Sequence, residues 1–508
     1  MDQTPSSKEF SLLSPPIFLL LPVIFIIIKH IASLSSNRRP LPPGPRPWPI
    51  VGNIFHLDKK LHISTTRFAK LHGPLISLRL GTQVVIFGSS PTAAAEILKN
   101  HDRLLSARWT LKVIPRKIHE LERISVIWNP TCNDQWKSLR ALFRTELFSA
   151  KAIQSQATLR EKKLSEMVEF FTTQQGTVIN IGEIVFATVF NTISNLIFSK
   201  DLIALEDKEV ASGLKSLFWM TMELASAPNI AEFYPILEGL DPQGLRRKMS
   251  ECIEQMFGVW EIYIKERREK HVNDATKTDF LDVFLSSGFD DDLINWLIAE
   301  LMSAGVETTT TTVEWAMAEI LKNKRVMEKV GEELQRVINR GTIHESEVSQ
   351  LTYVNAVVKE TLRLHPPAPF LLPHRAPETC EVMNYTIPKD SQIFVNVWAI
   401  GRDPSVWEDP LSFKPERFLE SSLDLKGHDF ELIPFGSGRR ICPGLTMATR
   451  QIPMILASLI HYFEWSLENG EDPATIDMND KFGVTLQKEK PLLVIPRRNR
   501  RFRDCVIP

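Results

Sequence analysis

The sequence has few cysteines and almost no net charge. Its 508 residues include five cysteines, and 60 Lys and Arg against 61 Asp and Glu leave a formal charge of −1. The cysteines are odd in number and widely spaced, with no CxxC or CxxxC pair, which argues against a disulfide framework and a zinc site. The balanced charge gives no indication of a nucleic-acid partner.

One apolar run of membrane-spanning length lies near the N-terminus. It reads SLLSPPIFLLLPVIFIII, ends at Ile28, and is followed by Lys29, His30, Arg38 and Arg39. This charge distribution predicts an uncleaved single-pass anchor over residues 1–30, with the body of the chain in the cytosol. The alternative, a cleaved signal peptide, lacks a clear small-residue cleavage site and has its positive charge on the wrong side.

The rest of the chain divides into a short linker and one long body. Residues 31–53 are basic and proline-rich, and PLPPGPRPWPIVGN predicts an extended hinge. Residues 54–508 show no internal repeat and no domain break. PLISLRL, QVVIFG and NYTIPKDSQIFVNVWAI are typical of strands, and most of the remainder has apolar residues at helical spacing. We expect a mainly α fold, a large helical body with a small β region.

The stretch PFGSGRRICPG, residues 434–444, holds a single cysteine in an unusual loop. Its spacing is FGxGxRxCxG, formed by Phe435, Gly436, Gly438, Arg440, Cys442 and Gly444. Glycine permits positive φ and close approach to a flat partner. The start of the helix that follows favours a thiolate at Cys442, and Arg440 can grip a carboxylate. An isolated cysteine is more often an inert buried thiol, but the full spacing favours a metal ligand.

A polar cluster interrupts the longest helical pattern, which runs from about residue 291 past residue 319. It reads AGVETT, residues 304–309, and five successive threonines begin at Thr308. Threonine is a poor helix former, and its hydroxyl can bond the carbonyl four residues earlier. Gly305 leaves room for a flat ligand or O2, and Glu307 followed by Thr308 suits a proton relay. A helix with a polar face is an equally compatible alternative.

The loop around Cys442 resembles the haem-thiolate signature of the cytochrome P-450 family. The resemblance implies the cytochrome P-450 fold, haem b as cofactor, and Cys442 as the proximal iron ligand. It implies that Arg440 holds a haem propionate and that Phe435 packs beside the ligand loop. AGVETT is similar to the family's AGxDTT motif, so Glu307 and Thr308 would guide protons during dioxygen activation.

Two further motifs extend the resemblance. Glu360 and Arg363 match the family's ExxR motif, and Arg417 lies in PERF. On spacing alone this pair would be a surface salt bridge, whereas the resemblance implies a structural charge cluster. The second motif is the WxxxR spacing of Trp136 and Arg140, together with Arg375. By themselves these residues indicate only packing and solvated charge, whereas the resemblance implies that they bind haem propionates.

Several passages are similar to the plant microsomal, alkaloid-oxidising group that includes N-methylcoclaurine 3′-hydroxylase, phenol-coupling enzymes and littorine mutase. Examples are SSPTAAAEILKNHDRLLSAR and GHDFELIPFGSGRRICPG, while WTLKVIPRKIHELERISVIWNP and AGVETTTTT differ from the hydroxylase pattern. The similarity implies the endoplasmic reticulum membrane, electrons from NADPH through NADPH–cytochrome P-450 reductase, and monooxygenation of an alkaloid. Alternatives are phenol coupling, radical rearrangement of a tropane ester, a reductase-independent haem-thiolate isomerase, and a non-enzymatic haem sensor.

Two surfaces are predicted around this site. Apolar character predicts a substrate pocket walled by residues 107–127, Met302, Ala304, residues 370–372 and Val484. Basic residues near the cysteine loop are our candidates for the face that docks the reductase, namely Lys137, Arg144 and Arg439.

Overall fold

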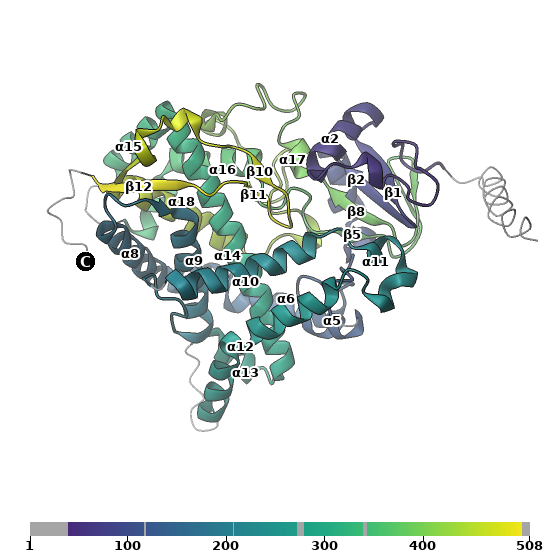
Figure 1. Cartoon of the computed structure of the whole chain (residues 1–508), viewed down its shortest axis with the longest axis horizontal. Coiled ribbons are helices and arrows are strands. Elements are labelled where there is room, and N and C mark those ends of the chain that lie inside the picture. The colour runs from purple at the N-terminus through teal and green to yellow at the C-terminus, as the bar shows by residue number, and fades with distance from the viewer. Residues whose placement is uncertain (1–38, 116–117, 207, 272–278, 339–342, 500–508) are drawn as a thin grey trace, which may run out of the picture.

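Helices fill most of the molecule, and a small β-sheet lies at one side of it (Figure 1). The computed structural model describes residues 39–115, 118–206, 208–271, 279–338 and 343–499. The predicted mainly α fold with a small β region is confirmed. The predicted anchor, residues 1–30, lies outside the described residues.

The helices follow the apolar spacing seen in the sequence. Those of more than ten residues are α2 (Leu61–His72), α6 (Asp134–Glu146), α8 (Ala157–Thr173), α9 (Ile181–Phe198), α10 (Lys208–Ser226), α12 (Leu245–His271), α14 (Asp291–Lys322), α15 (Lys324–Val337), α16 (Thr352–Leu364) and α18 (Leu445–Tyr462). The shorter ones are α3 (Pro91–Ala95), α4 (Asp102–Leu105), α5 (Ile118–Ile124), α7 (Ala150–Ser155), α11 (Ile230–Phe233), α13 (Phe280–Ser286) and α17 (Val397–Ile400).

The largest sheet joins distant parts of the chain in the order β1-β2-β8-β5-β3. Its strands are β1 (Leu75–Leu80), β2 (Gln83–Gly88), β8 (Gln392–Val395), β5 (His374–Arg375) and β3 (Ala107–Arg108). β1 and β2 form the predicted hairpin, with Leu80 opposite Gln83. β3 pairs antiparallel with β5, which places Arg108 opposite His374 and next to Arg375.

Three smaller sheets complete the β region. They are β4 (Ile179–Asn180), β12 (Leu493–Arg498) and β9 (Phe463–Ser466); β6 (Cys380–Val382) with β7 (Tyr385–Ile387); and β10 (Asp480–Lys481) with β11 (Gln487–Lys488). The prediction of strands throughout NYTIPKDSQIFVNVWAI is wrong at its end, where α17 forms. Asn396 Oδ1 accepts the Ala399 N–H at 3.0 Å and so starts a helical turn there.

The described part of the predicted hinge lies against the large sheet. The Ser77 backbone N–H and hydroxyl donate to the carbonyls of Pro43 at 3.0 Å and Pro42 at 2.5 Å. A Cβ at Gly44 would come within 2.1 Å of the Ser77 carbonyl oxygen, so this approach requires glycine. The extended path favoured by proline therefore follows the edge of β1.

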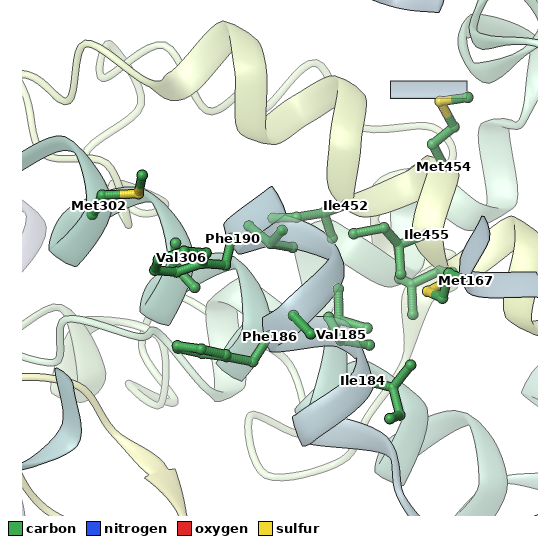
Figure 2. Packing of buried hydrophobic residues seen from close by; sticks show 14 of the residues in the cluster. Met167, Ile184, Val185, Phe186, Phe190, Met302, Val306, Ile452, Met454 and Ile455 are labelled. Carbon is green, nitrogen blue, oxygen red and sulfur yellow. The ribbon is translucent and has the colours of Figure 1, made fainter. Parts of the chain in front are cut away.

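Helix α14 runs through the core of the helical body. It packs against α9, α12, α16 and α18, and the helix predicted from about residue 291 past residue 319 is confirmed. Figure 2 shows part of this core, including Phe186 and Phe190 of α9, Met302 and Val306 of α14, and Ile452 and Ile455 of α18. Each of these side chains is at most 2% exposed, and such burial contributes about 1.5–3 kcal/mol per side chain.

Helix α9 passes the length and composition test for a membrane span, but its surroundings are those of a core helix. It is 18 residues long, and 72% of it is buried inside the protein. A helix that is apolar on all sides suits the core of a large protein as well as a membrane. Its contacts with α14 and α8 account for its composition.

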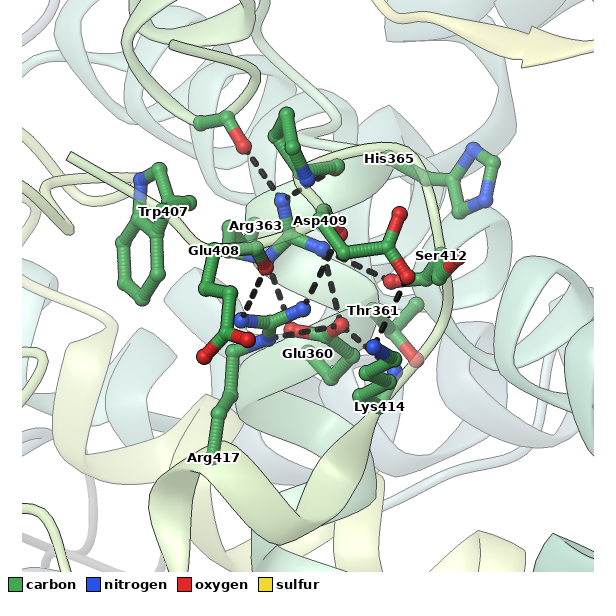
Figure 3. A network of polar contacts seen from close by, with 12 residues as sticks. Glu360, Thr361, Arg363, His365, Trp407, Glu408, Asp409, Ser412, Lys414 and Arg417 are labelled. Atoms are coloured by element: carbon green, nitrogen blue, oxygen red, sulfur yellow. Dashed lines mark hydrogen bonds and ion pairs between the residues drawn. The ribbon is translucent and has the colours of Figure 1, made fainter. Parts of the chain in front are cut away.

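A buried charge cluster joins α16 to the segment before residue 418 (Figure 3). Glu360 and Arg363, whose side chains are 0% exposed, form a two-point ion pair at 2.7 and 2.8 Å. The Arg417 Nε and the Lys414 backbone N–H donate to the same Glu360 oxygen at 3.1 and 2.7 Å. Arg363 also donates to the carbonyls of Gly401, Pro410 and Ser412. The pair is therefore a buried link between segments, not a surface salt bridge.

We expect Arg363→Met to lower the free energy of unfolding by about 3–5 kcal/mol, because it leaves the Glu360 charge buried without its main partner. Thermal and chemical unfolding of the purified variant measure the loss. Lys324→Met is the control, since the Lys324 side chain is 91% exposed and its contact with Glu328 is long, at 3.9 Å. This variant should change the free energy of unfolding by less than about 0.5 kcal/mol. Equal stability of the two variants would contradict this assignment.

Candidate active site

Cys442 lies in a tight loop directly before α18. Its N–H donates to the Phe435 carbonyl at 2.9 Å and closes the loop. Gly436 and Gly438 have φ of +73° and +66°, and a Cβ at Gly438 would come within 2.3 Å of the Leu98 carbonyl oxygen. These glycines therefore have the conformational role that the spacing predicts.

The Cys442 side chain is half-buried and lies against the first turn of α18. Burial raises the pKa of its thiol, while the N–H groups of Gly444 and Leu445 and the charge of Arg140 act in the opposite direction. The helix start therefore favours a thiolate only in part, and a bound cation would complete its stabilisation.

A metal cage built from several side chains is not found near Cys442. Within the ranges that the structure describes, no group of three or more His, Cys, Asp or Glu could hold a metal ion. A single thiol suits a metal that brings most of its ligands with it, as a metal in a macrocycle does.

Two buried arginines, Arg108 and Arg440, and the half-buried Arg140 lie beside this loop without a carboxylate at ion-pair distance among the described residues. Arg108 donates to the Leu372 carbonyl at 2.9 Å, Arg140 to the Ile441 carbonyl, and Arg440 to the carbonyls of Ser106 at 2.9 Å and Asn129 at 2.7 Å. Burial lowers the pKa of all three, to about 10 for Arg440, and their mutual repulsion adds to the effect. None of them forms an ion pair with a carboxylate in the described part of the chain.

Some donors of this group have no hydrogen-bond partner. They are the buried N–H groups at Arg108 Nε and Arg440 Nη1, both without an acceptor among the described residues. Arg375 Nε is also buried without an acceptor, but the pairing of β5 with β3 sets Arg375 opposite Ala107 and His374 opposite Arg108, so the Arg375 side chain leaves the other face of the sheet from Arg108. The binding of a propionate by Arg375 therefore stays a prediction. We call Arg108, Arg140 and Arg440 the arginine cradle. Its unbalanced charge and free donors fit a ligand that carries carboxylates.

Arg108 is the member of the cradle that sequence analysis does not single out. The sequence feature that could have pointed to Arg108 is its position at the end of LLSAR, in a passage that is similar to the alkaloid-oxidising group. Its place beside the site depends on the pairing of β3 with β5, in which Arg108 lies opposite His374, 266 positions away in the chain.

Trp136 contacts the cradle through its ring. Its Nε1–H donates to the Val126 carbonyl at 2.9 Å. This donor is therefore already occupied and is not available for the hydrogen bond to a propionate that the resemblance implies. The guanidinium groups of Arg440 and Arg140 lie 4.5 and 5.8 Å from the ring centre. The indole thus supports two cationic side chains by cation–π contact.

The middle of α14 presents small residues to open space. Ala304 is exposed, and Gly305 and Thr308 are half-buried, although the turns on either side belong to the core. Thr308 Oγ1 donates to the Ala304 carbonyl at 2.7 Å, which is the predicted bond to the carbonyl four residues earlier. Ala304 and Thr308 border this open stretch, whereas a Cβ at Gly305 would come within 2.6 Å of Ile193 Cδ1 on α9. Gly305 therefore allows close packing of two helices, and the prediction that it leaves room for a flat ligand is wrong.

Glu307 lies on a different face of α14 from Thr308. Its carboxylate is buried and accepts hydrogen bonds from Gln487 on β11 and, at 3.4 Å, from Thr311. Burial raises its pKa to about 7, against the opposing charge of Lys215. Successive helical residues point about 100° apart, so neighbours in sequence do not share a face. The expected direct relay from acid to alcohol is not assembled here.

The predicted pocket walls separate into two groups. Ala304, Leu371, Leu372 and Val484 are exposed or half-buried. Met302 is 0% exposed and belongs to the core cluster of Figure 2, because two helical steps turn it about 200° away from Ala304.

Two of the three predicted docking residues already have surface partners. Lys137 pairs with Asp134 at 2.8 Å, and Arg439 pairs with Asp102 at 2.9 Å. Arg144 is exposed near the end of α6. The net positive character expected of this face is therefore reduced.

Comparison with known proteins agrees with this geometry. The profile of the family described as Cytochrome P450, written here cytochrome P-450, matches residues 42–495. A probable (S)-N-methylcoclaurine 3′-hydroxylase isozyme 2 from Coptis japonica is 49% identical over 93% of this chain and 96% of its own length. Corytuberine synthase from Coptis japonica is 44% identical, with coverages of 95% and 98%. Geraniol 8-hydroxylase from Catharanthus roseus is 43% identical, with coverages of 91% and 95%. Because these similarities extend over nearly the whole of each chain, this protein belongs to the cytochrome P-450 family of monooxygenases.

Proposed function

We propose that this monooxygenase is anchored in the endoplasmic reticulum membrane, binds haem b through Cys442, and oxidises a plant alkaloid. The arginine cradle beside Cys442 is the observation that supports the cofactor most directly. Haem b brings its own nitrogen ligands to iron and carries carboxylates. A lone thiol and a group of buried, partly free guanidinium donors meet these two requirements.

Each residue of the site has a separate proposed task. Cys442 ligates the iron, and Arg108, Arg375 and Arg440 donate to the propionates. The bound cofactor supplies dioxygen activation with electrons that reach it from NADPH through NADPH–cytochrome P-450 reductase. Phe435, which is half-buried against the core, shields the sulfur from water.

Two groups of α14 that can transfer protons, the Thr308 hydroxyl and the Glu307 carboxyl, lie at different places relative to the open stretch of the helix. The Thr308 hydroxyl faces that space and can turn from the Ala304 carbonyl to a ligand. The Glu307 carboxyl, with its pKa of about 7, can release and regain a proton near neutral pH. Because the two side chains lie on different faces, we propose Glu307 as a proton reserve that needs an intervening water.

The substrate class is proposed from the relatives. Two of the three compared enzymes belong to alkaloid oxidation, one named as a hydroxylase and one as a synthase. The third is named for geraniol, which carries no basic nitrogen. An alkaloid is therefore the favoured substrate, and geraniol is the competing class to include in a test.

We expect microsomes that contain this protein, reductase and NADPH to convert a benzylisoquinoline or tropane alkaloid to a product one oxygen atom heavier. Mass spectrometry identifies the product, and loss of two hydrogens or an isomer of equal mass would instead indicate coupling or rearrangement. Cys442→Ser is the matched control and should abolish turnover because sulfur ligation is lost. Unchanged turnover without NADPH or reductase would contradict monooxygenation, and conversion of geraniol alone would contradict the alkaloid proposal.

Arg108→Gln should weaken haem retention by at least about tenfold, because it removes a charge-assisted contact to a propionate. Haem transfer to an acceptor protein measures retention. The protein freed of haem should be no less stable than wild type, since the change also removes repulsion with Arg440. Arg103→Gln, at an exposed site on α4, is the control. Equal retention by both variants would argue against the cradle.

The raised pKa of Glu307 predicts a specific pH dependence of stability. Between its unfolded value near 4.5 and its folded value of about 7, the folded state holds the extra proton, so this contribution is complete below 4.5 and is lost as the pH rises through 7. Relative to Glu307→Gln, wild type should lose up to about 3 kcal/mol between pH 5 and pH 8. Denaturant unfolding at several pH values measures the difference. Glu254→Gln, exposed on α12, is the control, and a wild-type curve parallel to that of Glu307→Gln would disprove the shift.

A further inference from the structure

The segment between β3 and α6 is attached to the rest of the molecule at several separate places. At its end, Arg440 donates to the Asn129 carbonyl at 2.7 Å and Trp136 to the Val126 carbonyl at 2.9 Å. Near its beginning, Glu232 of α11 accepts the Trp109 indole N–H at 2.9 Å and the Lys112 backbone N–H at 2.5 Å. The inner part of the segment depends on a further contact, with α14.

That contact is made by Glu300, a buried glutamate of α14 that is 7% exposed. One of its oxygens accepts the Ser125 hydroxyl and, at 3.0 Å, the Trp296 indole N–H. The other accepts the backbone N–H groups of Val126 at 2.8 Å and Ile127 at 3.1 Å. Four donors from two elements therefore converge on one carboxylate.

The position of Glu300 on its helix connects this contact to the active site. Glu300, Ala304 and Thr308 follow one another at intervals of four residues, so they lie along one face of α14, and Glu300 is about 12 Å along the axis from Thr308. Ala304, between them, is exposed although the turns of α14 on either side are buried. The backbone that Glu300 holds therefore lies beside the open stretch of α14.

We infer that Glu300 is a positioning residue for the substrate, because it fixes Ser125–Ile127 as a rigid wall of the space above Ala304 and Thr308. This inference rests on the proposed function, in which that space holds the substrate. Glu300 itself does not bind the substrate, since its oxygens are already occupied by four donors. Ile127 is half-buried, so its side chain has surface available for contact once the backbone is fixed.

Glu300→Gln tests this role with little change in volume. The amide keeps one acceptor oxygen and places an NH2 group where N–H donors converge, so either the two backbone N–H groups or the Trp296 indole N–H and the Ser125 hydroxyl lose their acceptor. A loosened wall is less pre-organised for a bulky ligand. The chain offers a close control in Glu333 of α15, which accepts the Thr352 hydroxyl and the backbone N–H groups of Tyr353 and Val354 at 2.8–2.9 Å. Glu333→Gln thus removes the same kind of buried clamp in a different place.

Two iron-binding probes measure the wall without a known substrate. Imidazole is small, whereas 4-phenylimidazole must also fit its ring into the space, and both are followed by their haem absorption changes. In Glu300→Gln we expect the Kd of 4-phenylimidazole to rise about tenfold and that of imidazole less than about twofold, and both should change less than about twofold in Glu333→Gln. Ser125→Ala removes one donor and should shift the Kd of 4-phenylimidazole by about threefold in the same direction, which keeps the test available if Glu300→Gln does not retain haem.

Several outcomes would overturn the inference. One is an unchanged Kd of 4-phenylimidazole in both variants of the clamp. Another is equal weakening of both probes, which would show that Glu300 merely stabilises the fold. The titrations need no turnover, so the expected shifts in a protein that oxidises no alkaloid would support the role of Glu300 while refuting the proposed substrate. With an oxidised alkaloid in hand, Glu300→Gln should also change the ratio of products, and an unaltered ratio counts against it.

Discussion

The arginine cradle concentrates positive charge in a place where no described carboxylate forms an ion pair with it, although the charge of Glu300 acts on Arg440. Burying a charge is tolerable only when an opposite charge or strong acceptors accompany it. The carbonyls around the cradle satisfy some of its donors, and Arg108 and Arg440 keep others free. In the proposed function, the carboxylates of the ligand would relieve repulsion among the arginines, and its metal cation would balance the charge of a thiolate at the half-buried Cys442.

Buried glutamates have a complementary role outside the cradle. Glu300, Glu333 and Glu360 each accept backbone N–H groups from a segment that is distant in sequence. A carboxylate offers two acceptor oxygens and so can hold a stretch of irregular backbone that has no ladder of its own. Glu300 and Glu360 in this way fix coil segments that pass near the site, whereas Glu333 accepts N–H groups from the first turn of α16. The contact at Glu360 secures the chain before the cysteine loop, and that at Glu300 secures the segment above α14.

Helix α14 serves the site with two faces that have different chemistry. One face carries Glu300, Ala304 and Thr308 and includes the exposed stretch. Another carries Glu307 toward β11, where burial keeps its carboxyl group protonated up to about neutral pH. A helix places neighbouring residues on separate faces, which divides the functions of acid and alcohol. In the proposed function, proton supply and ligand contact are thus related through the body of the helix rather than by direct contact.

The sequence alone determined the elements and the chemistry of single motifs. Apolar periodicity located α14, the segments PLISLRL and QVVIFG located the first two strands, and the spacing around Cys442 identified the thiol and its glycines, because these features depend on neighbours within a few residues. Only the tertiary structure decided which charges meet. Arg108 lies opposite His374 through pairing of strands that are hundreds of residues apart, Met302 turns into the core, and Glu307 turns away from Thr308. Such outcomes depend on long-range packing and on the direction of each side chain around its helix, and local spacing specifies neither.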